Sequence, residues 1–280
     1  MTQRAHRRTK IVATIGPASE SEALLGRLVR AGVDVFRLNF SHGSPAHHAE
    51  VARRVRQEAQ RAGRYVGILA DLQGPKIRIA GFRDGPVMLE SGDSFRLDGG
   101  LGEEEGTARA VGYGFRELPQ YLAPGDTLLL DDGRLRLRVD DVTGPVIDCT
   151  VELGGRLAAR KGINRLGGGI AAPALTEKDI ADIRGLDAVQ PDFVAVSFVS
   201  STEDIRLARE LLEERGLAPA LVAKIERAEV VGNDQVLDAI LKASDGIMVA
   251  RGDLGVEVGD AELIGIQKDL ISRARKSDRV

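Results

Sequence analysis

The chain has 280 residues, of which 43% are hydrophobic, and its 39 basic and 42 acidic side chains give a net charge of -3. A chain of this size can bury a sizeable core, as one large domain or as one domain with an insertion. The near-neutral charge, with only seven Phe, three Tyr and no Trp, argues against a nucleic-acid-binding surface. A basic N-terminal cluster is expected to be solvated; it comprises Arg4, Arg7, Arg8 and Lys10.

The cysteine count and the hydropathy pattern bear on the compartment. Cys149 is the single cysteine, so an internal disulfide is impossible. No apolar run approaches the roughly 20 residues of a membrane helix, and no cleavable signal pattern opens the chain. We therefore expect a cytoplasmic protein with no membrane partner.

Apolar runs with strand character alternate with helical patterns from the N-terminus onward. Apolar residues at spacings of three and four, such as Ala52, Val55 and Ala59, indicate a helix that starts with the cap Ser44 and Pro45. The expected elements in this part are strands at 10–15, 33–40 and 65–70 and helices at 20–31 and 45–62. This alternation is typical of βα units.

The same alternation returns after residue 174. Thr176 and Asp179 have the spacing of a capping box at the start of a helix. The expected elements are strands at 193–198, 220–225 and 246–250 and helices at 201–215, 235–243 and 261–275. Counting both parts, the sequence predicts six βα units of a parallel βα barrel.

Between Gly74 and about Pro173 the pattern changes to short apolar runs broken by Gly and Asp, which indicates an all-β insertion. The predicted fold is thus α/β, a (β/α)8 TIM-type barrel with an inserted all-β barrel domain. Its expected parts are residues 1–74 as the first part of the barrel, 75–173 as the inserted domain and 174–280 as the second part of the barrel. A β domain placed on a barrel loop can act as a lid, because active sites of such barrels lie at the C-terminal ends of the strands.

Charged side chains stand at two of these strand ends. Lys224 and Glu226 lie two residues apart, so on a strand both point to one face. A second carboxylate, Asp253, follows the next strand. Two carboxylates with water and substrate oxygens are typical of a Mg²⁺ or Mn²⁺ site, and a cation beside it suits an enolate or phosphoryl group. Each residue alone is also compatible with a structural role, as an ion pair or an exposed loop carboxylate.

Polar side chains also end the second and third expected strands. Arg37, Asn39 and Ser41 alternate onto one face, and Asp71 ends the third strand. A guanidinium can bind a phosphate through two hydrogen bonds, whereas the amide, hydroxyl and carboxylate oxygens suit a cation, which could be monovalent. Turn or cap chemistry is an equally good reading of Asn39 and Ser41.

Several segments along the whole chain resemble segments of pyruvate kinase and occur in the same order as in that family. They are similar to those of a bacterial member. In the βα parts they are 9–18 (TKIVATIGPA), 37–43 (RLNFSHG), 71–78 (DLQGPKIR), 175–179 (LTEKD), 224–226 (KIE) and 248–255 (MVARGDLG). In the insertion they are 129–133 (LLDDG) and 161–164 (KGIN). The resemblance implies transfer of a phosphoryl group from phosphoenolpyruvate to ADP, giving pyruvate and ATP, the last step of glycolysis.

The resemblance also implies roles for individual residues. Lys224 would stabilise the phosphoryl group in transfer and the enolate, and Glu226 and Asp253 would hold Mg²⁺ or Mn²⁺. The backbone amides of Arg251, Gly252 and Asp253 would bind the substrate carboxylate at a helix N-terminus. K⁺ would be bound by Asn39, Ser41, Asp71 and the carbonyl of Leu72. Phosphate groups would be bound by Arg37, Arg78 and Lys161, of which Arg78 and Lys161 would bind the nucleotide. Asp132 would lie on the lid.

The chain departs from the family in length, since family members continue into two more barrel strands and a regulatory domain. A barrel that stops after about six βα units would have unpaired edge strands, so we expect impaired folding of the isolated chain, and a homo-oligomer if the barrel is completed. Two alternatives to an active kinase stay open. One is a catalytically dead remnant that binds metal or phosphate or pairs with a full-length subunit; the other is a Mg²⁺-dependent aldolase or lyase.

Overall fold

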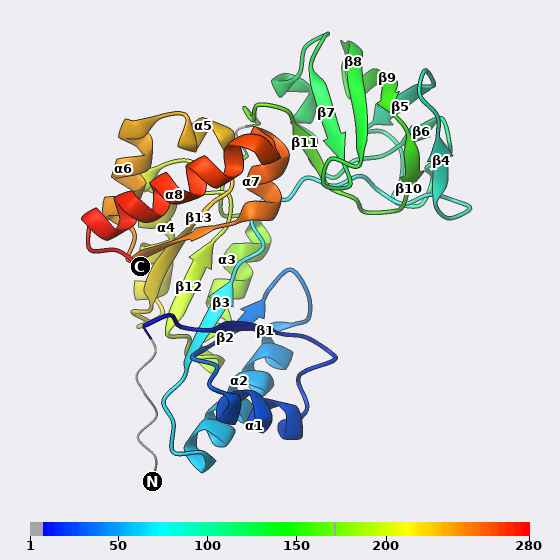
Figure 1. Ribbon diagram of the computed structural model, residues 1–280. Coiled ribbons are helices and arrows are strands. Elements are labelled where there is room, and N and C mark those ends of the chain that lie inside the picture. Colours follow the sequence, from blue (N-terminus) through cyan, green and yellow to red (C-terminus); the bar gives the residue numbers. More distant parts are fainter. Residues whose placement is uncertain (1–7, 171) are drawn as a thin grey trace.

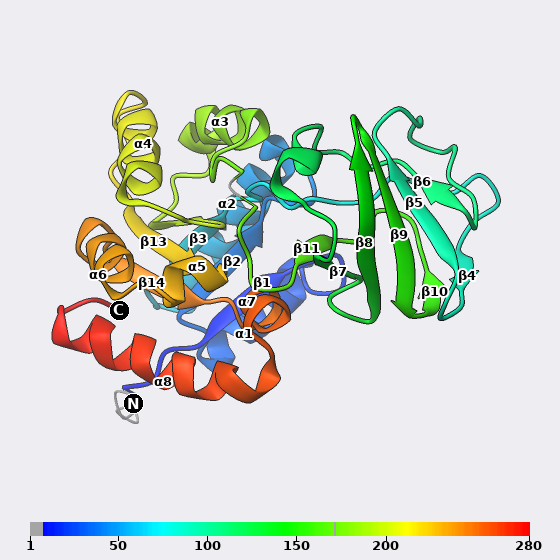
Figure 2. The ribbon, with the colours of Figure 1, turned by 90° about the horizontal axis from the view of Figure 1, so that it is seen from above.

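A computed structural model describes residues 8–170 and 172–280 (Figure 1). In this part of the chain, parallel strands form a six-stranded sheet in the order β1-β2-β3-β12-β13-β14. These strands are β1 (Val12–Ile15), β2 (Val35–Asn39), β3 (Gly67–Asp71), β12 (Phe193–Val196), β13 (Ala220–Ile225) and β14 (Gly246–Val249). With the helices on its outer side, the sheet is an open part of a TIM-type barrel, so the predicted α/β fold class is confirmed (Figure 2).

Helices connect the strands of this sheet. They are α1 (Glu22–Ala31), α2 (Pro45–Arg61), α3 (Glu177–Arg184), α4 (Thr202–Glu213), α5 (Ala228–Val231), α6 (Asp234–Ala243), α7 (Arg251–Val258) and α8 (Asp260–Lys276), with a 3₁₀ turn η2 (Leu186–Ala188) after α3. Ser44 caps α2 by accepting from the amide of His47, and Thr176 and Asp179 form the predicted capping box of α3. These local signals explain why the helices begin where the sequence predicts.

The barrel part has its own hydrophobic core. Fully buried side chains from the strands, such as Phe36, Ile68 and Val194, pack against helix residues such as Leu25 and Ile240. Parallel strands that are buried on both faces carry nearly continuous apolar runs, and β3, β12 and β13 accordingly have consecutive buried residues.

The insertion forms a second β structure with a separate core (Figure 1). Its strands are β4 (Val87–Leu89), β5 (Ser94–Asp98), β6 (Ala110–Val111), β7 (Thr127–Leu130), β8 (Leu135–Thr143), β9 (Val146–Leu153), β10 (Gly155–Leu157) and β11 (Ile163–Arg165), with a 3₁₀ turn η1 (Leu118–Tyr121). One sheet has the order β11-β7-β8-β9-β5-β6, and β10 pairs with β4. Alternating buried and exposed residues along β8 match a strand with one face in the core. The domain boundaries at residues 74 and 173 stay predictions.

The two outermost strands of the barrel sheet are β1 and β14, as expected for six βα units. Val12 on β1 is 53% exposed. On the other side, the amide of Ile247 donates to the carbonyl of Val280 at 2.7 Å, so the last residue covers part of the β14 edge. The edge at β1 thus exposes apolar side chains more than a closed barrel would.

Most strand ends of the barrel part differ from the expected bounds by one or two residues. Tyr65, expected to begin the third strand, precedes β3 and is exposed. Of the expected basic cluster at the N-terminus, Arg4 and Arg7 lie outside the described residues. None of the helices in residues 8–170 and 172–280 has the length and apolarity needed to cross a bilayer.

Candidate active site

Lys224 lies at the centre of a buried cluster of charges. It is 9% exposed near the end of β13, and its Nζ lies 3.0 Å from Oε1 of Glu226 and 3.2 Å from Oδ1 of Asp71. Burial acts to lower the pKa of Lys224, but the carboxylates of Glu226 and Asp71 outweigh burial and raise it. The ammonium group therefore stays charged. It lies on the same face of the strand end as Glu226, as the two-residue spacing predicts.

Asp71 connects this cluster to the neighbouring strands. Its side chain, at the end of β3, is fully buried, and Nε of Arg37 donates to Oδ2 at 2.6 Å. Arg37 also donates through Nη1 to Oγ1 of Thr14 at 2.9 Å, which joins β1 to the cluster. Asn39 stands opposite Asp71 in the register of β2 and β3. Three predicted residues, Arg37, Asn39 and Asp71, are thus brought together with Lys224.

The residues predicted for K⁺ make contacts within the protein. Oδ1 of Asn39 accepts from the amide of Ser41 at 3.1 Å, and the carbonyl of Leu72 accepts from Oγ of Ser197 at 2.7 Å. Oδ1 of Asp71 is buried, and its neighbour is Nζ of Lys224 at 3.2 Å. The amide, hydroxyl, carboxylate and carbonyl oxygens are of the type that suits a monovalent ion, and Arg37 and Lys224 already neutralise the charge of Asp71.

Glu226 is the more buried of the two predicted carboxylate ligands. It is 1% exposed, and its Oε2 accepts from the backbone amide of Phe198 at 2.7 Å. Burial raises the pKa of Glu226 and the charge of Asp253 adds to this effect, whereas Lys224 opposes it. A divalent cation would relieve the repulsion between the two carboxylates, so the pair fits Mg²⁺ or Mn²⁺.

Asp253 lies in the first turn of α7. Its Oδ1 accepts from Nζ of Lys76 at 2.8 Å. Arg251 and Gly252 precede it and are exposed, and the N-cap residue of this helix, Ala250, makes no side-chain cap hydrogen bond. Backbone amides at the positive end of a helix are suited to a carboxylate or phosphate.

The remaining predicted residues lie on the insertion and its connection to the barrel. Arg78 forms an antiparallel bridge with Gly162, and Nζ of Lys161 lies 2.7 Å from Oδ1 of Asp131. Asp132, which follows β7, is 3.8 Å from Nζ of Lys76. Lys76 thus lies between Asp132 of the insertion and Asp253 of the barrel, where the two parts of the chain face each other.

Sequence reasoning missed Ser197 and gave Lys76 no role. Ser197 is fully buried after β12, and Nζ of Lys224 donates to its Oγ at 2.6 Å. Its one sequence signal is a hydroxyl at the end of an apolar run, which is a weak signal because such serines often cap helices. Lys76 is positively charged, so a pattern of carboxylate metal ligands does not include it.

A hollow of about 560 Å³ adjoins the cluster at the ends of β1 and β2. It was not predicted, because its residues come from separate loops. The residues that line it include Gly16, Pro17, Glu20, Asn39, His42, Gly43 and His47. Nε2 of His47 lies 3.0 Å from Oε2 of Glu20 on its wall.

The structure is therefore of the parallel βα-barrel class: it is an open part of such a barrel with an inserted β structure, and a lysine, two carboxylates and a helix N-terminus lie at its strand ends. A model of the barrel domain of pyruvate kinase matches residues 6–280. The chain belongs to the pyruvate kinase family.

Curated relatives have the same name. The chain is 52% identical over 273 residues to "Pyruvate kinase" of Haemophilus influenzae and 52% identical over 273 residues to "Pyruvate kinase II" of Salmonella typhimurium, with 98% of the chain and 57% of each relative covered. It is 44% identical over 271 residues to "Pyruvate kinase" of Mycobacterium intracellulare, with 97% of the chain and 56% of the relative covered. The chain thus spans little more than half the length of these relatives.

Proposed function

We propose that this chain supplies the catalytic site of a pyruvate kinase, which transfers a phosphoryl group from phosphoenolpyruvate to ADP and yields pyruvate and ATP. The observation that carries the proposal is the buried ammonium of Lys224, held charged between Glu226 and Asp71. Phosphoryl transfer depends on positioning and on neutralisation of charge, which a fixed cation supplies. Membership of the family supports the same reaction.

The proposed roles follow the geometry. The phosphate of phosphoenolpyruvate binds near Arg37 and Lys224, and its carboxylate binds the amides of Arg251, Gly252 and Asp253 at the start of α7. As the phosphoryl group leaves, Lys224 neutralises the charge that develops on the enolate oxygen. Arg78 and Lys161, on the side of the insertion, approach the nucleotide phosphates, with Asp132 beside them. The hollow beside Asn39 has room for the nucleoside of ADP.

The proposed metal sites use the carboxylates described above. Glu226 and Asp253 would hold Mg²⁺ or Mn²⁺, which when bound neutralises phosphate oxygens and aligns the two substrates. Before the ion binds, Lys224 and Lys76 neutralise these carboxylates. Asn39, Ser41, Asp71 and the carbonyl of Leu72 would hold K⁺.

The K⁺ proposal has its own test, because Arg37 and Lys224 already neutralise Asp71. Pyruvate formation is measured with Mg²⁺ in the presence of K⁺ or of an equal concentration of tetramethylammonium, which is too large for the site. We expect at least a tenfold higher rate with K⁺. Equal rates would show that the two side chains supply the charge by themselves.

The main test is pyruvate formation from phosphoenolpyruvate and ADP with Mg²⁺ and K⁺, measured for the purified chain beside a longer chain of the length of its relatives. Lys224→Met keeps the volume of the side chain and removes the charge, so we expect it to abolish turnover. Lys242→Met, at an exposed position on α6, serves as the control and should retain the wild-type rate.

The outcomes of this test distinguish an active pyruvate kinase from a catalytically dead remnant. Turnover by Lys224→Met would refute the role given to Lys224. No turnover by either wild-type chain, with metal binding intact, would favour the catalytically dead remnant. A Mg²⁺-dependent aldolase or lyase has no comparable support, since the family match covers residues 6–280.

A further inference from the structure

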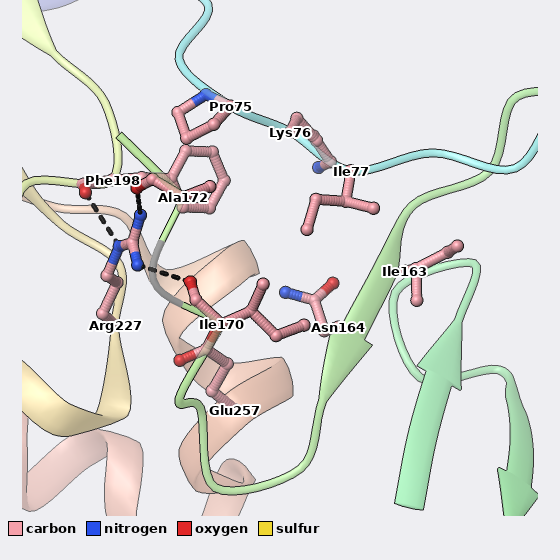
Figure 3. A pocket seen from close by; sticks show the side chains of 10 residues that line it. All are labelled: Pro75, Lys76, Ile77, Ile163, Asn164, Ile170, Ala172, Phe198, Arg227 and Glu257. Carbon is pink, nitrogen blue, oxygen red and sulfur yellow. Dashed lines mark hydrogen bonds between the residues drawn. The ribbon is translucent and has the colours of Figure 1, made fainter. Parts of the chain in front are cut away.

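Arg227 directly follows the carboxylate Glu226, yet it points into the junction between the barrel and the insertion. Its side chain is 4% exposed. As Figure 3 shows, its guanidinium donates to three backbone carbonyls, those of Phe198 from Nε, Ile170 from Nη1 and Ala172 from Nη2, each at 2.8 Å. Because the guanidinium is planar and rigid, these bonds fix the three carbonyls relative to one another.

The carbonyls belong to two different parts of the chain. Ile170 and Ala172 lie on the segment that returns from β11 of the insertion to the barrel, whereas Phe198 follows β12 of the barrel. Phe198 also donates its amide to Oε2 of Glu226 at 2.7 Å. One residue, Phe198, is therefore bound through its carbonyl to Arg227 and through its amide to Glu226.

The backbone of Phe198 depends on these bonds. Its φ is 54°, in the left-handed region that a bulky residue rarely adopts. Such a conformation persists only where surrounding contacts fix it. A shift of the return segment that moved Arg227 would thus displace the backbone of Phe198, whose amide binds Glu226.

A second connection runs from the return segment to the other carboxylate. The amide of Gly167 donates to the carbonyl of Glu257 on α7 at 3.2 Å, and Oε2 of Glu257 accepts from the amide of Ala228 at 2.8 Å. The same helix carries Asp253 in its first turn. A cavity of only about 30 Å³ remains among these residues, room for about one water, so a shift of one part at this junction would press on the other (Figure 3).

We infer that Arg227 is a positioning residue that couples the orientation of the β insertion to the placement of the carboxylates Glu226 and Asp253. The inference rests on the proposed function only in that these carboxylates hold a divalent cation. It implies that cation binding and insertion orientation influence each other reciprocally.

The test measures the two sides of this coupling separately. Spin labels on Glu103→Cys in the insertion and Glu203→Cys on α4 report the distance between the two parts, because both side chains are exposed and the native Cys149 is buried. The distance distribution is recorded with and without Mg²⁺. Mn²⁺ affinity is measured in the unlabelled chain by electron paramagnetic resonance of the free ion.

In the wild type we expect Mg²⁺ to shift or narrow the distance distribution. Arg227→Lys retains the charge but cannot reach three carbonyls, so we expect Mg²⁺ to leave the distribution unchanged and Mn²⁺ affinity to fall about tenfold. Arg209→Lys is the matched control, because Arg209 also donates to a backbone carbonyl, that of Ala243, and pairs with Asp245. It should behave like the wild type.

A wild-type response in Arg227→Lys, or a wild-type distribution that Mg²⁺ does not change, would overturn the inference. If Arg227→Lys does not fold, two glycines inserted after Gly168 lengthen the return segment with Arg227 intact. We expect this variant to lose the Mg²⁺ response, and a retained response would contradict the coupling. Since no readout uses turnover, a chain without kinase activity but with intact coupling would refute the proposed function alone.

Discussion

The hydroxyl of Ser197 joins two groups that belong to different strands. It accepts from Nζ of Lys224 at 2.6 Å and donates to the carbonyl of Leu72 at 2.7 Å. Both bonds are buried. Because a buried polar group that loses its partner costs about 1–3 kcal/mol, this side chain should stabilise the fold and orient the ammonium.

Ser197→Ala tests that role. We expect the free energy of unfolding in urea to fall by about 1–3 kcal/mol, since Leu72 and Lys224 each lose a hydrogen bond. We also expect slower pyruvate formation through a lower kcat, because Lys224 is no longer held toward the substrate. Ser91→Ala on the insertion is the control. A variant that loses stability but keeps its kcat would limit Ser197 to a structural role.

Single residues of the site differ in how far the sequence predicts them. The spacing of Lys224 and Glu226 predicts that both side chains share a face, and the structure places their charged groups 3.0 Å apart. Ser197 and Lys76 have no such pattern, because their partners lie 27 and 177 residues away in the chain. Contacts of this range depend on the arrangement of the strands, which the local sequence does not contain. The assigned roles of all these residues stay predictions.

At the scale of elements, α7 carries a buried carboxyl at its C-terminal part. The pKa of Glu257 is raised from 4.5 to about 7. Burial is the largest cause and the nearby Glu229 adds to it, whereas the bond to the amide of Ala228, Arg227 and Asn164 act to lower it. In the folded chain Glu257 thus keeps its proton to a higher pH than in the unfolded chain. The unfolded state binds fewer protons between pH 4.5 and about 7, so stability falls as the pH rises through this window and is constant above it.

Glu257→Gln is therefore expected to remove this pH dependence. The amide is neutral at every pH and can still accept from Ala228, so the variant should gain up to about 3 kcal/mol over the wild type between pH 4.5 and 7. Urea unfolding at several pH values measures the difference. Glu262→Gln, at an exposed position on α8, should follow the wild-type curve. Parallel curves for Glu257→Gln and the wild type would show that Glu257 is charged in the folded state.

The turn after β3 requires glycine for two reasons. Gly74 has a φ of 67°, and a Cβ at this position would lie 2.6 Å from Cβ of Ser197. Gly63 has a similar φ of 61° with open space around it. We expect Gly63→Ala to cost about 1–2 kcal/mol in unfolding free energy, from backbone strain alone, and Gly74→Ala to cost clearly more because Ser197 must move. Equal losses would mean that the turn adapts without disturbing the site.

Elements with strong local signals were predicted well. The capping box of Thr176 and Asp179 and the apolar spacing in α2 predict helices that the structure confirms. The short helix α5 (Ala228–Val231) was not predicted, because four residues carry no periodicity. Its position is fixed by contacts such as the bond from Ala228 to Glu257, which arise only after the strands assemble. The first and last residues of the strands were predicted less accurately, because they too depend on contacts that form only after the strands assemble.

At the scale of the whole molecule, two separate hydrophobic cores lie on either side of a small junction between the barrel part and the insertion. The alternation of βα units predicts the order of the parallel strands, since each connection through a helix adds the next strand beside the last. How the insertion faces the barrel depends on Arg227, Lys76 and Asp253, which come from separate segments. That arrangement could not be predicted from composition or spacing.

The exposed edge at β1 leads to a prediction about self-association. Val12 is 53% exposed on β1, which within residues 8–170 and 172–280 pairs on one side only, and such edges tend to pair with other chains. We expect the chain to associate at micromolar concentration and to lack a cooperative thermal transition as a monomer. Val12→Lys places a charge on this edge and should reduce association in sedimentation velocity, whereas Met88→Lys on β4, where the side chain is 61% exposed, should not. A monomer that melts cooperatively would show that the open sheet is stable by itself in spite of the exposed edge at β1.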